Sequence, residues 1–382
     1  MAAVRERERT LDEVKAVLRE RLATRGAPLN FAEEEQARAA LERLDGLDGE
    51  RWAAAWGAAG ALFEDAGQAA EARDHSQVAG DSYFQAYNFY FVGRFPCPNH
   101  PAKLASYAKA RENYVKAGRY FDPPLERVVL PFAGRPDEGK ELVFYVRKPK
   151  GVARPPVLLR WGGIDTWKEE RHDLNERFLQ EGYATVNFDM PGTGESPVLA
   201  SPDAERQYTL VFEWLRAQPD LDGSRIGCIG MSFGGYWATK LAHTHRDYLA
   251  AVVNWGGGIH GAFQPDWLRG SRYADSYLME LGETRARIMG LPDYESYIER
   301  AHTLSLLDQG VLDQPSAPLL LVNGKDDRQV PIKDLYLVLE HGDPKAARVF
   351  PGGHMGHTPE TFPTILAWIR QHLGPGDSTT SR

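Results

Sequence analysis

Residues 225–242 read RIGCIGMSFGGYWATKLA, an apolar run followed by a glycine-rich turn and a stretch of good helix formers. This succession predicts a strand, a tight turn and a helix, with Ser232 at the turn. Gly230 and Gly234 flank the serine, and small residues there let the backbones of a strained turn approach each other. The helix would direct its amide end at negative charge that develops during nucleophilic attack. The pattern therefore favours Ser232 as a nucleophile over a surface serine in an ordinary turn.

A serine hydroxyl is a weak nucleophile, so the chain must supply a base. In turns of this kind the acid and then the histidine follow the nucleophile along the chain, which restricts the base to late positions. Residues 350–357 read FPGGHMGH and form a loop after the last predicted strand. His354, directly after two glycines, is the predicted base, with His357 as its competitor and a structural loop histidine as the remaining alternative.

The acid is expected after the preceding strand, where residues 319–331 read LLLVNGKDDRQVP. Asp326 and Asp327 are adjacent candidates. The arrangement Gly-x-x-Asp-x-x-Val-Pro resembles the acid loop of many α/β hydrolases, and this resemblance selects Asp327 to orient the histidine. Asp326 would then hold the loop by bonding backbone amides, as aspartates in turns commonly do.

An oxyanion requires two backbone donors, one of them from the residue after the nucleophile, Phe233. The second is expected in the loop after the third strand, residues 160–165, which read RWGGID. The amide of Gly163 or that of Ile164 would serve, and the sequence does not choose between them. Residues 189–196, DMPGTGES, lack a lysine after their glycines and are interpreted as a structural turn rather than a phosphate loop.

Short runs rich in Val, Leu, Ile and aromatic residues recur beyond residue 121 and predict eight strands. The first two are close enough for a hairpin, and the later ones are separated by enough chain for crossover helices. The predicted fold is α/β, an α/β-hydrolase fold with an eight-stranded, mostly parallel sheet covered by helices on both faces. The expected strands are 127–132, 142–147, 157–161, 184–188, 225–229, 250–255, 319–323 and 347–350.

Three further regions complete the predicted organisation. Residues 1–121 are rich in Ala, Glu, Arg and Leu and predict a helical N-terminal domain that ends where Asp122-Pro123-Pro124 breaks the pattern. The catalytic domain would span 122–373, with a helical insertion at 256–314, after the sixth strand and over the sheet edge where α/β folds bind ligands. Residues 374–382 are expected to be a disordered tail.

Composition excludes several classes of function. The 382 residues include 45 basic and 53 acidic side chains, for a net charge of -8 and no long basic run, so we expect no nucleic-acid partner. The two cysteines have no metal-ligand spacing, and no apolar run approaches the roughly 20 residues of a membrane helix. With an N-terminus unlike a secretory signal, a cytoplasmic location, no membrane association and no metal are expected.

The motifs together resemble the α/β-hydrolase superfamily. Within it the chain is similar to the group that contains 2,6-dihydroxypseudooxynicotine hydrolase, the fungal polyketide-shortening hydrolases and the fermentation-respiration switch protein. The similarity spans about residues 83–373 and rests on FP at 95–96, SY at 106–107, FDPPLERV at 121–128 and GGIDTWKEE at 162–170.

The resemblance implies a triad of Ser232, Asp327 and His354 that cleaves an acyl bond in a small-molecule acyl or ketone substrate. Hydrolysis of a carbon-carbon bond beside a ketone, as in β-ketone, polyketide-like or aromatic ketone substrates, is the reaction that it favours. It also implies that no cofactor takes part, and that the chain forms a homodimer with the helical domain over the active site.

Substrate contacts are less clearly marked. Tyr83, Tyr87 and Tyr90 share a helical face and could line a pocket for an aromatic ring, although packing is the favoured role for aromatics at helical spacing. Further candidates are Asp165 in the loop after the third strand and, after the sixth, Trp255 and His260, with core packing and a surface loop as the alternatives for the last two.

Two other functions remain open. The same fold could serve a carboxylesterase, a serine peptidase or an acyltransferase, because specificity depends on the regions around the triad. A non-catalytic binding or regulatory protein on the same scaffold is the alternative from another class. The presence of all three triad residues argues against that alternative.

Overall fold

The computed structural model describes residues 5–342 and 345–374, and the predicted tail from 375 onward lies outside them. The chain divides into two compact units. The first comprises Met1–Glu126 and Tyr277–Thr284, and the second Arg127–Ser276 and Arg285–Arg382. The predicted insertion, residues 256–314, is therefore shared between the units, because its residues 277–284 group with the N-terminal helices.

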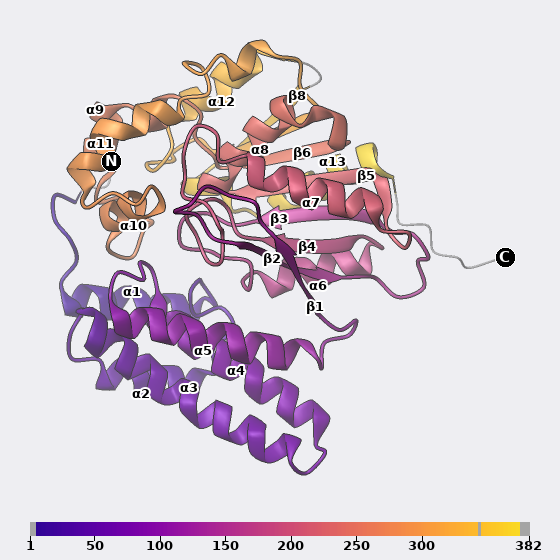
Figure 1. Ribbon diagram of the computed structural model, residues 1–382. Coiled ribbons are helices and arrows are strands. Elements are labelled where there is room, and N and C mark those ends of the chain that lie inside the picture. The colour runs from indigo at the N-terminus through magenta and orange to yellow at the C-terminus, as the bar shows by residue number, and fades with distance from the viewer. Residues whose placement is uncertain (1–4, 343–344, 375–382) are drawn as a thin grey trace. The chain divides into compact units, whose positions relative to one another are not determined.

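The first unit is built from five helices, drawn in indigo to purple in Figure 1. Four of them begin at a side-chain cap, the fourth helix being the exception: Thr10 and Glu13 form a capping box on the first helix, and the Asp48 carboxylate accepts the Arg51 amide at the third. The fourth helix packs against both the third and the fifth, and Trp52 and Trp56 of the third helix and Tyr114 of the fifth are fully buried. The helices are α1 (Leu11–Ala23), α2 (Glu34–Arg43), α3 (Gly49–Glu71), α4 (Ser76–Arg94) and α5 (Pro101–Gly118).

The second unit contains one eight-stranded sheet with the order β1-β2-β4-β3-β5-β6-β7-β8. Strand β2 runs antiparallel to β4. The six strands from β3 to β8 each run parallel to their neighbours within that group, which confirms the predicted mostly parallel sheet. The strands are β1 (Glu126–Pro131), β2 (Glu141–Arg147), β3 (Pro156–Trp161), β4 (Ala184–Phe188), β5 (Asp222–Met231), β6 (Ala251–Trp255), β7 (Leu319–Gly324) and β8 (Lys345–Phe350).

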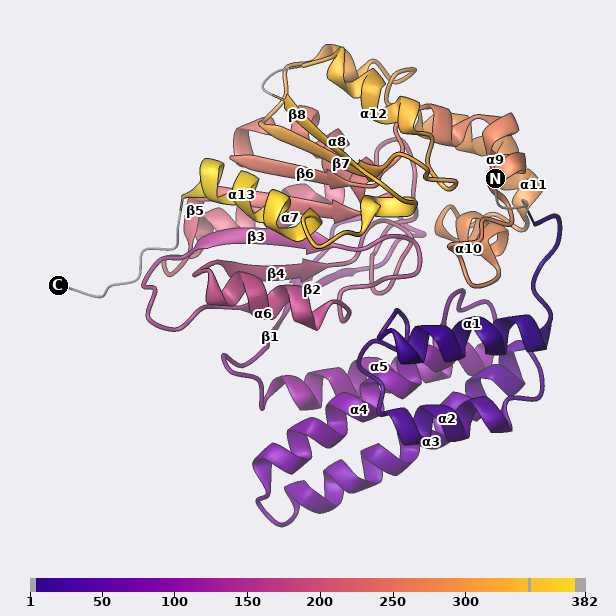
Figure 2. The same ribbon diagram turned by 180° about the vertical axis from the view of Figure 1, so that it is seen from behind.

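Helices cover both faces of the sheet, and the central strands β3, β4, β6 and β7 are accordingly buried along their whole length. Figures 1 and 2 show α7 (Arg206–Ala217) and α8 (Phe233–Thr244) on one face and α6 (His172–Gln180) and α13 (Thr361–Leu373) on the other. One core layer joins α6 and α13 to the sheet through residues such as Phe178, Ile229, Val253, Leu320 and Ile369.

The segment after β6 is helical, in short pieces: α9 (Pro265–Ser271), α10 (Leu281–Ile288) and α11 (Tyr294–Arg300), with a 3-10 turn before α9 and two after α11. Helix α12 (Ile332–Leu339) follows β7. Among the described residues, no helix has the length and hydropathy to cross a membrane. Nor does that part of the chain group three His, Cys, Asp or Glu residues so that they could hold a metal ion.

Candidate active site

Ser232 stands at a sharp turn between β5 and α8. Strand β5 extends further than predicted, to Met231, and Ser232 itself has φ 53° and ψ -128°. Positive φ is costly for a residue with a Cβ and recurs at functional turns. The Ser232 amide donates to the Trp255 carbonyl at 2.8 Å, which ties the turn to β6. A Cβ on Gly230 would lie 2.0 Å from the Gly234 carbonyl oxygen, so the turn requires glycine at that position.

The structure brings Ser232, His354 and Asp327 together. His354 Nε2 lies 2.7 Å from Ser232 Oγ, and His354 Nδ1 lies 2.7 Å from Asp327 Oδ2. These distances are those of hydrogen bonds, so the imidazole connects the hydroxyl to the carboxylate. A proton leaving Ser232 Oγ would be accepted at Nε2, while Asp327 holds the other nitrogen in its protonated form.

Asp327 is surrounded by donors. Its Oδ1 accepts the amides of Gln329 at 2.8 Å and Val330 at 3.2 Å, and its Oδ2 also accepts Asn323 Nδ2 at 2.9 Å. Burial opposes the charged form of this carboxyl, yet its pKa is lowered, because the charge of His354 and the hydrogen bonds outweigh burial. The carboxylate is thus kept ionised next to the histidine.

The loop that carries His354 is fixed by two side chains at the carboxyl ends of β6 and β7. Asn323 Oδ1 accepts the Met355 amide at 2.9 Å, while its amide nitrogen holds Asp327. Trp255 Nε1 donates to the Met355 carbonyl at 2.7 Å. Asn323 was not among the predicted site residues, because an asparagine near the end of an apolar strand carries no pattern of its own.

The loop after β3 passes directly beside the nucleophile. A Cβ on Gly163 would lie 2.9 Å from Ser232 Cβ and 3.2 Å from its Oγ. Among the described residues, no backbone carbonyl accepts the amides of Gly163, Ile164 or Phe233, the last of which begins α8. Uncommitted amides beside a serine are what an oxyanion hole requires, and both loop amides remain candidates for the second donor.

A buried cluster of charged side chains around Lys168 holds the loop that follows β3. Lys168 Nζ lies within 2.9 Å of Glu169, Asp189 and Glu195, and Asp189 Oδ1 accepts the Lys168 amide at 2.9 Å. Burial raises the pKa of Glu169, against the opposing charge of Lys168. The turn at 189–196, which is interpreted from the sequence as structural, therefore carries two carboxylates, Asp189 and Glu195, that hold the loop after β3 through Lys168.

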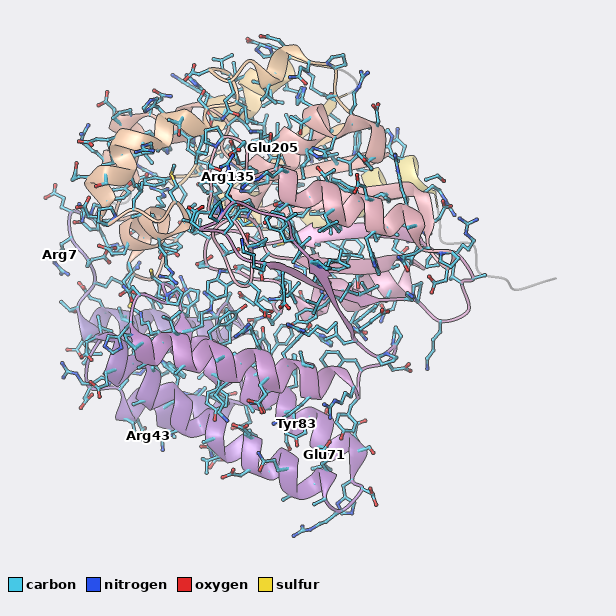
Figure 3. All side chains as sticks on the ribbon, viewed as in Figure 1. Arg7, Arg43, Glu71, Tyr83, Arg135 and Glu205 are labelled. Carbon is cyan, nitrogen blue, oxygen red and sulfur yellow. The ribbon has the colours of Figure 1, made fainter. Side chains whose placement is uncertain are left out.

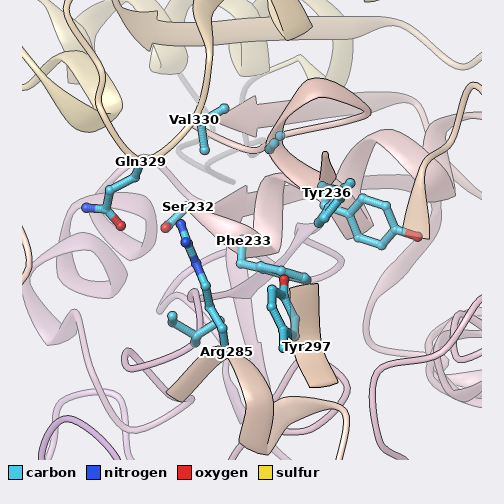
Figure 4. Close-up of a pocket in the computed structure, with 11 residues that line it drawn as sticks. Ser232, Phe233, Tyr236, Arg285, Tyr297, Gln329 and Val330 are labelled. Atoms are coloured by element: carbon cyan, nitrogen blue, oxygen red, sulfur yellow. The ribbon is translucent and has the colours of Figure 1, made fainter. Parts of the chain in front are cut away.

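A pocket opens over Ser232 and is drawn in Figure 4. Of the predicted residues, Ser232, Phe233 and Ile164 line it. The remaining lining residues were not predicted; Gln329 and Val330 belong to the acid loop, Tyr236 lies one turn along α8, and the others come from the segment after β6. These others are Gly258, Ala262, Phe263, Arg285 and Tyr297.

The predicted substrate contacts in α4 are core residues of the helical unit. Tyr83 donates to Glu71 at 2.7 Å, a pair labelled in Figure 3, and Tyr90 donates to Glu64 at 2.9 Å. Tyr87 packs edge-on against Tyr114, with ring centroids 4.8 Å apart. All three tyrosines are buried. The helical unit thus encloses the three rings and uses the hydroxyls of Tyr83 and Tyr90 internally, which agrees with packing, the role that the sequence favoured for them.

The other predicted contacts do not line the Ser232 pocket either. Trp255 is buried, and its indole N–H donates to the Met355 carbonyl in the loop that carries His354. His260 Nδ1 pairs with Ser305 Oγ at 2.7 Å, and the Asp165 carboxylate accepts the neighbouring Thr166 hydroxyl at 3.4 Å. These hydrogen bonds lie within or between loops, and a role of the three side chains as substrate contacts stays a prediction.

The two residues that competed for triad positions lie elsewhere. His357 packs edge-on against Trp255, at 5.5 Å between centroids, and makes no hydrogen bond to Ser232. Asp326 does not hold the acid loop in the expected way, because Asp327 itself accepts the loop amides.

Comparisons with known proteins agree with this architecture. Residues 27–368 match the family model described as esterase FrsA-like. The chain is 30% identical over 237 residues to "2,6-dihydropseudooxynicotine hydrolase" of Paenarthrobacter nicotinovorans, an alignment that covers 61% of this chain and 59% of that protein. It is 26% identical over 300 residues to "Esterase FrsA" of Escherichia coli (strain K12), covering 77% and 69% of the two chains. The match thus spans about 59% of the length of the first of these relatives.

Two solved structures show the same fold. The crystal structure of the 2,6-dihydroxy-pseudo-oxynicotine hydrolase superposes with a TM-score of 0.76 at 24% identity, covering 95% of this chain and 98% of that one. The structure described as AbyA5 wildtype gives 0.72 at 22% identity, covering 94% and 95%. At 24% and 22% identity, these two superpositions show a shared fold and no more.

Proposed function

The chain belongs to the esterase FrsA-like family and is an α/β hydrolase, and from this premise we propose that it is a serine hydrolase with the triad Ser232, His354 and Asp327. The observation that carries the proposal is the pair of 2.7 Å contacts that His354 makes, one to Ser232 Oγ and one to Asp327 Oδ2. This arrangement lets one imidazole take up and return a proton while its orientation stays fixed.

In the first step, Ser232 Oγ attacks the substrate carbonyl carbon as its proton passes to His354 Nε2. The carbonyl oxygen becomes an anion and accepts the Phe233 amide together with the amide of Gly163 or Ile164. Asp327, with its lowered pKa, remains ionised and stabilises the imidazolium.

In the second step, the bond between the former carbonyl carbon and the leaving group breaks, and the leaving group takes the bonding electron pair and the proton from His354. A water molecule then attacks the acyl group on Ser232, gives a proton to His354 and releases the acid, and Ser232 regains its proton from the imidazole. No redox change occurs in either step.

We propose that the leaving group is a stabilised carbanion, so that a carbon-carbon bond beside a ketone is hydrolysed. The support is the resemblance of the sequence motifs and the 30% identity to a protein named as a pseudooxynicotine hydrolase. Ester hydrolysis is the second candidate, favoured by the esterase description of the family and of the Escherichia coli relative. Both reactions use the same triad and differ in the atom that His354 protonates.

Turnover on paired substrate panels tests this proposal. The purified protein is assayed with p-nitrophenyl acyl esters and with aryl β-diketones, and Ser232→Ala serves as the blank. Ser232-dependent cleavage of the diketones well above that of the esters supports carbon-carbon hydrolysis, whereas ester turnover alone moves the assignment to a carboxylesterase. A folded protein that neither turns over these substrates nor is labelled at Ser232 by a fluorophosphonate would instead be a binding protein.

A further inference from the structure

Arg285 brings a positive charge to the Ser232 pocket. It lies in α10 and is 7% exposed, and among the described lining residues it alone carries a charge. In Figure 4 its side chain extends from the helix toward Ser232. A buried guanidinium in a pocket otherwise lined by apolar and neutral polar side chains requires an explanation.

Only one nitrogen of this guanidinium is engaged by the described protein. Nη1 donates to Ser271 Oγ and to Tyr294 Oη, both at 3.0 Å. Nε and Nη2 have no acceptor in the described part of the chain, and no carboxylate there lies within 4 Å of the group. Donors that face a pocket without a counter-charge are available to a ligand.

The neutral groups around Arg285 complement it. Tyr297 lines the same pocket, and burial raises the pKa of its hydroxyl, which therefore stays protonated as a neutral donor despite the opposing effect of Arg285. Gln329 also lines the pocket, and its side-chain amide is held by a hydrogen bond from Nε2 to Ser276 Oγ at 2.8 Å. The pocket thus presents one cation with further hydrogen-bonding groups and no acidic lining residue among those described.

We propose that Arg285 forms an anion subsite, and that the substrate carries an anionic oxygen group, a carboxylate or the enolate of a β-dicarbonyl, in addition to the carbonyl that Ser232 attacks. Burying a charge without a partner is unfavourable, and an anionic substrate group would supply that partner. The planar fork of Nε and Nη2 matches a pair of carboxylate oxygens. This inference rests on the proposed function, since the subsite orders the substrate of that same serine.

Length-matched substrates measure the subsite directly. Mono-p-nitrophenyl glutarate, adipate and suberate are compared with p-nitrophenyl pentanoate, hexanoate and octanoate, and an enolisable aryl β-diketone is compared with its 2,2-dimethyl analogue, which cannot form the enolate. The readout is the anionic preference, the ratio of kcat/KM for the charged substrate to that for its neutral partner. Preference in the ester series identifies a carboxylate, and preference in the diketone pair identifies an enolate.

Arg285→Met removes the charge and keeps an unbranched apolar chain. It is expected to lower the anionic preference by about 10- to 100-fold, mostly through KM for the anionic partner, as for loss of a hydrogen bond to a charged group. Arg285→Lys retains a cation without the planar fork and is expected to keep part of the preference. The double variant Ser271→Ala, Tyr294→Phe removes the partners of Nη1 but not the cation, and should keep most of it.

Four results decide the matter. A wild-type preference that Arg285→Met loses and the double variant keeps supports the subsite. Wild-type protein without a preference, while turnover remains Ser232-dependent, overturns the subsite and leaves the hydrolase proposal intact. A double variant that loses the preference as fully as Arg285→Met assigns Arg285 a structural role and overturns the subsite. Absence of any Ser232-dependent turnover or labelling overturns the proposed function itself.

Discussion

The pocket over Ser232 has two sides that are built in different ways. On one side are the turns that follow β3, β5 and β7, where glycines and free amides surround the nucleophile, and where a Cβ on Gly163 would come within 2.9 Å of Ser232. On the other side is the segment after β6, where Phe263, Arg285 and Tyr297 present side chains. We call these the backbone side and the side-chain side.

This difference in construction assigns the chemical reaction to the backbone side and the choice of substrate to the side-chain side. Backbone donors and a strained turn can act on any acyl group, because they meet only the carbonyl and its developing charge. Side chains on an irregular segment meet the rest of the substrate and can change without disturbing the sheet. Changes on the backbone side should therefore lower kcat for all substrates, and changes on the side-chain side should alter their ranking.

The largest effect is expected from Ser232→Ala. Loss of the nucleophile should reduce kcat by about 10⁵- to 10⁶-fold on every substrate, leaving the residual rate of the oxyanion donors and binding. The melting temperature should stay within a few degrees of the wild-type value. Alanine also carries a Cβ, so it has the same backbone cost as serine at a φ of 53°. Unimpaired turnover by this variant would remove the central claim.

His354→Ala should follow closely. Removal of the base is expected to lower kcat by about 10⁴- to 10⁶-fold, since the contact at 2.7 Å to Ser232 is lost. His357→Ala is the matched control from the same loop and should cost far less, because that ring packs on Trp255. Comparable losses in the two variants would show that the base has been misassigned.

Asp327→Asn tests the orientation of the imidazole. A neutral amide at this position favours the wrong tautomer of His354 and should lower kcat by roughly 10³- to 10⁴-fold. The lowered pKa of Asp327 also predicts a stability effect: its contribution is fully present above the unfolded-state pKa of about 4 and is lost as pH falls through the lower native value. Melting curves between about pH 2 and pH 6 should show a smaller acid-induced decrease in the variant.

The backbone side could be predicted from the sequence because its geometry restricts residue choice. Only glycine fits at Gly230, whose Cβ would meet a carbonyl oxygen at 2.0 Å, and a buried parallel strand must precede the turn. The turn motif therefore singled out Ser232, chain order and the loop glycines favoured His354, and the resemblance to hydrolase acid loops selected Asp327. The structure places both Ser232 and Asp327 within hydrogen-bonding distance of His354. All eight strands were likewise visible as short runs of Val, Leu, Ile and aromatic residues, most clearly in the central strands β3, β4, β6 and β7, where burial on both faces leaves few alternatives.

The side-chain side could not be predicted in this way. An arginine and a tyrosine in a helical pattern look the same whether they face solvent or a pocket, so nothing in the sequence distinguished Arg285 or Tyr297. The role of Asn323 could not be predicted for a related reason. Its side chain connects the loops that carry Asp327 and His354, and these meet only in the folded sheet. The three tyrosines of α4 illustrate the same limit, because an aromatic pattern at helical spacing suits a pocket or a core, and here it serves the core that the sequence favoured.

Gly163→Ala tests the backbone side with one methyl group. The added Cβ would press on Ser232 and on the Met231 carbonyl, so we expect kcat to fall about 10²- to 10³-fold on ester and ketone substrates alike, as for loss of one oxyanion donor. Gly270→Ala, where an added Cβ meets nothing within 4 Å, is the matched control and should retain full turnover. A Gly163→Ala variant that changes substrate ranking but not kcat would contradict the division into two sides.

The smallest effect on catalysis is expected from Asp334→Asn, which loosens the side-chain side without touching the pocket. Asp334 is buried in the first turn of α12, where Oδ2 accepts the amides of Ile259, His260 and Ala262 and Oδ1 accepts that of Gly261. An asparagine has a single side-chain oxygen, which can stand at the position of Oδ1 or of Oδ2 but not at both, so at least one amide is left facing an NH₂ group. We expect the loss of about 1–3 kcal/mol of stability.

In this variant KM should rise by a few fold while kcat changes little, since the loop that carries Ala262 and Phe263 shifts but Ser232 and His354 stay in place. Calorimetry and steady-state kinetics measure both quantities, with Asp266→Asn, an exposed aspartate in the first turn of α9, as the control. If Asp334→Asn lowered kcat as strongly as Gly163→Ala does, the loop after β6 would contribute to the reaction itself. The two sides of the pocket would then be one functional element.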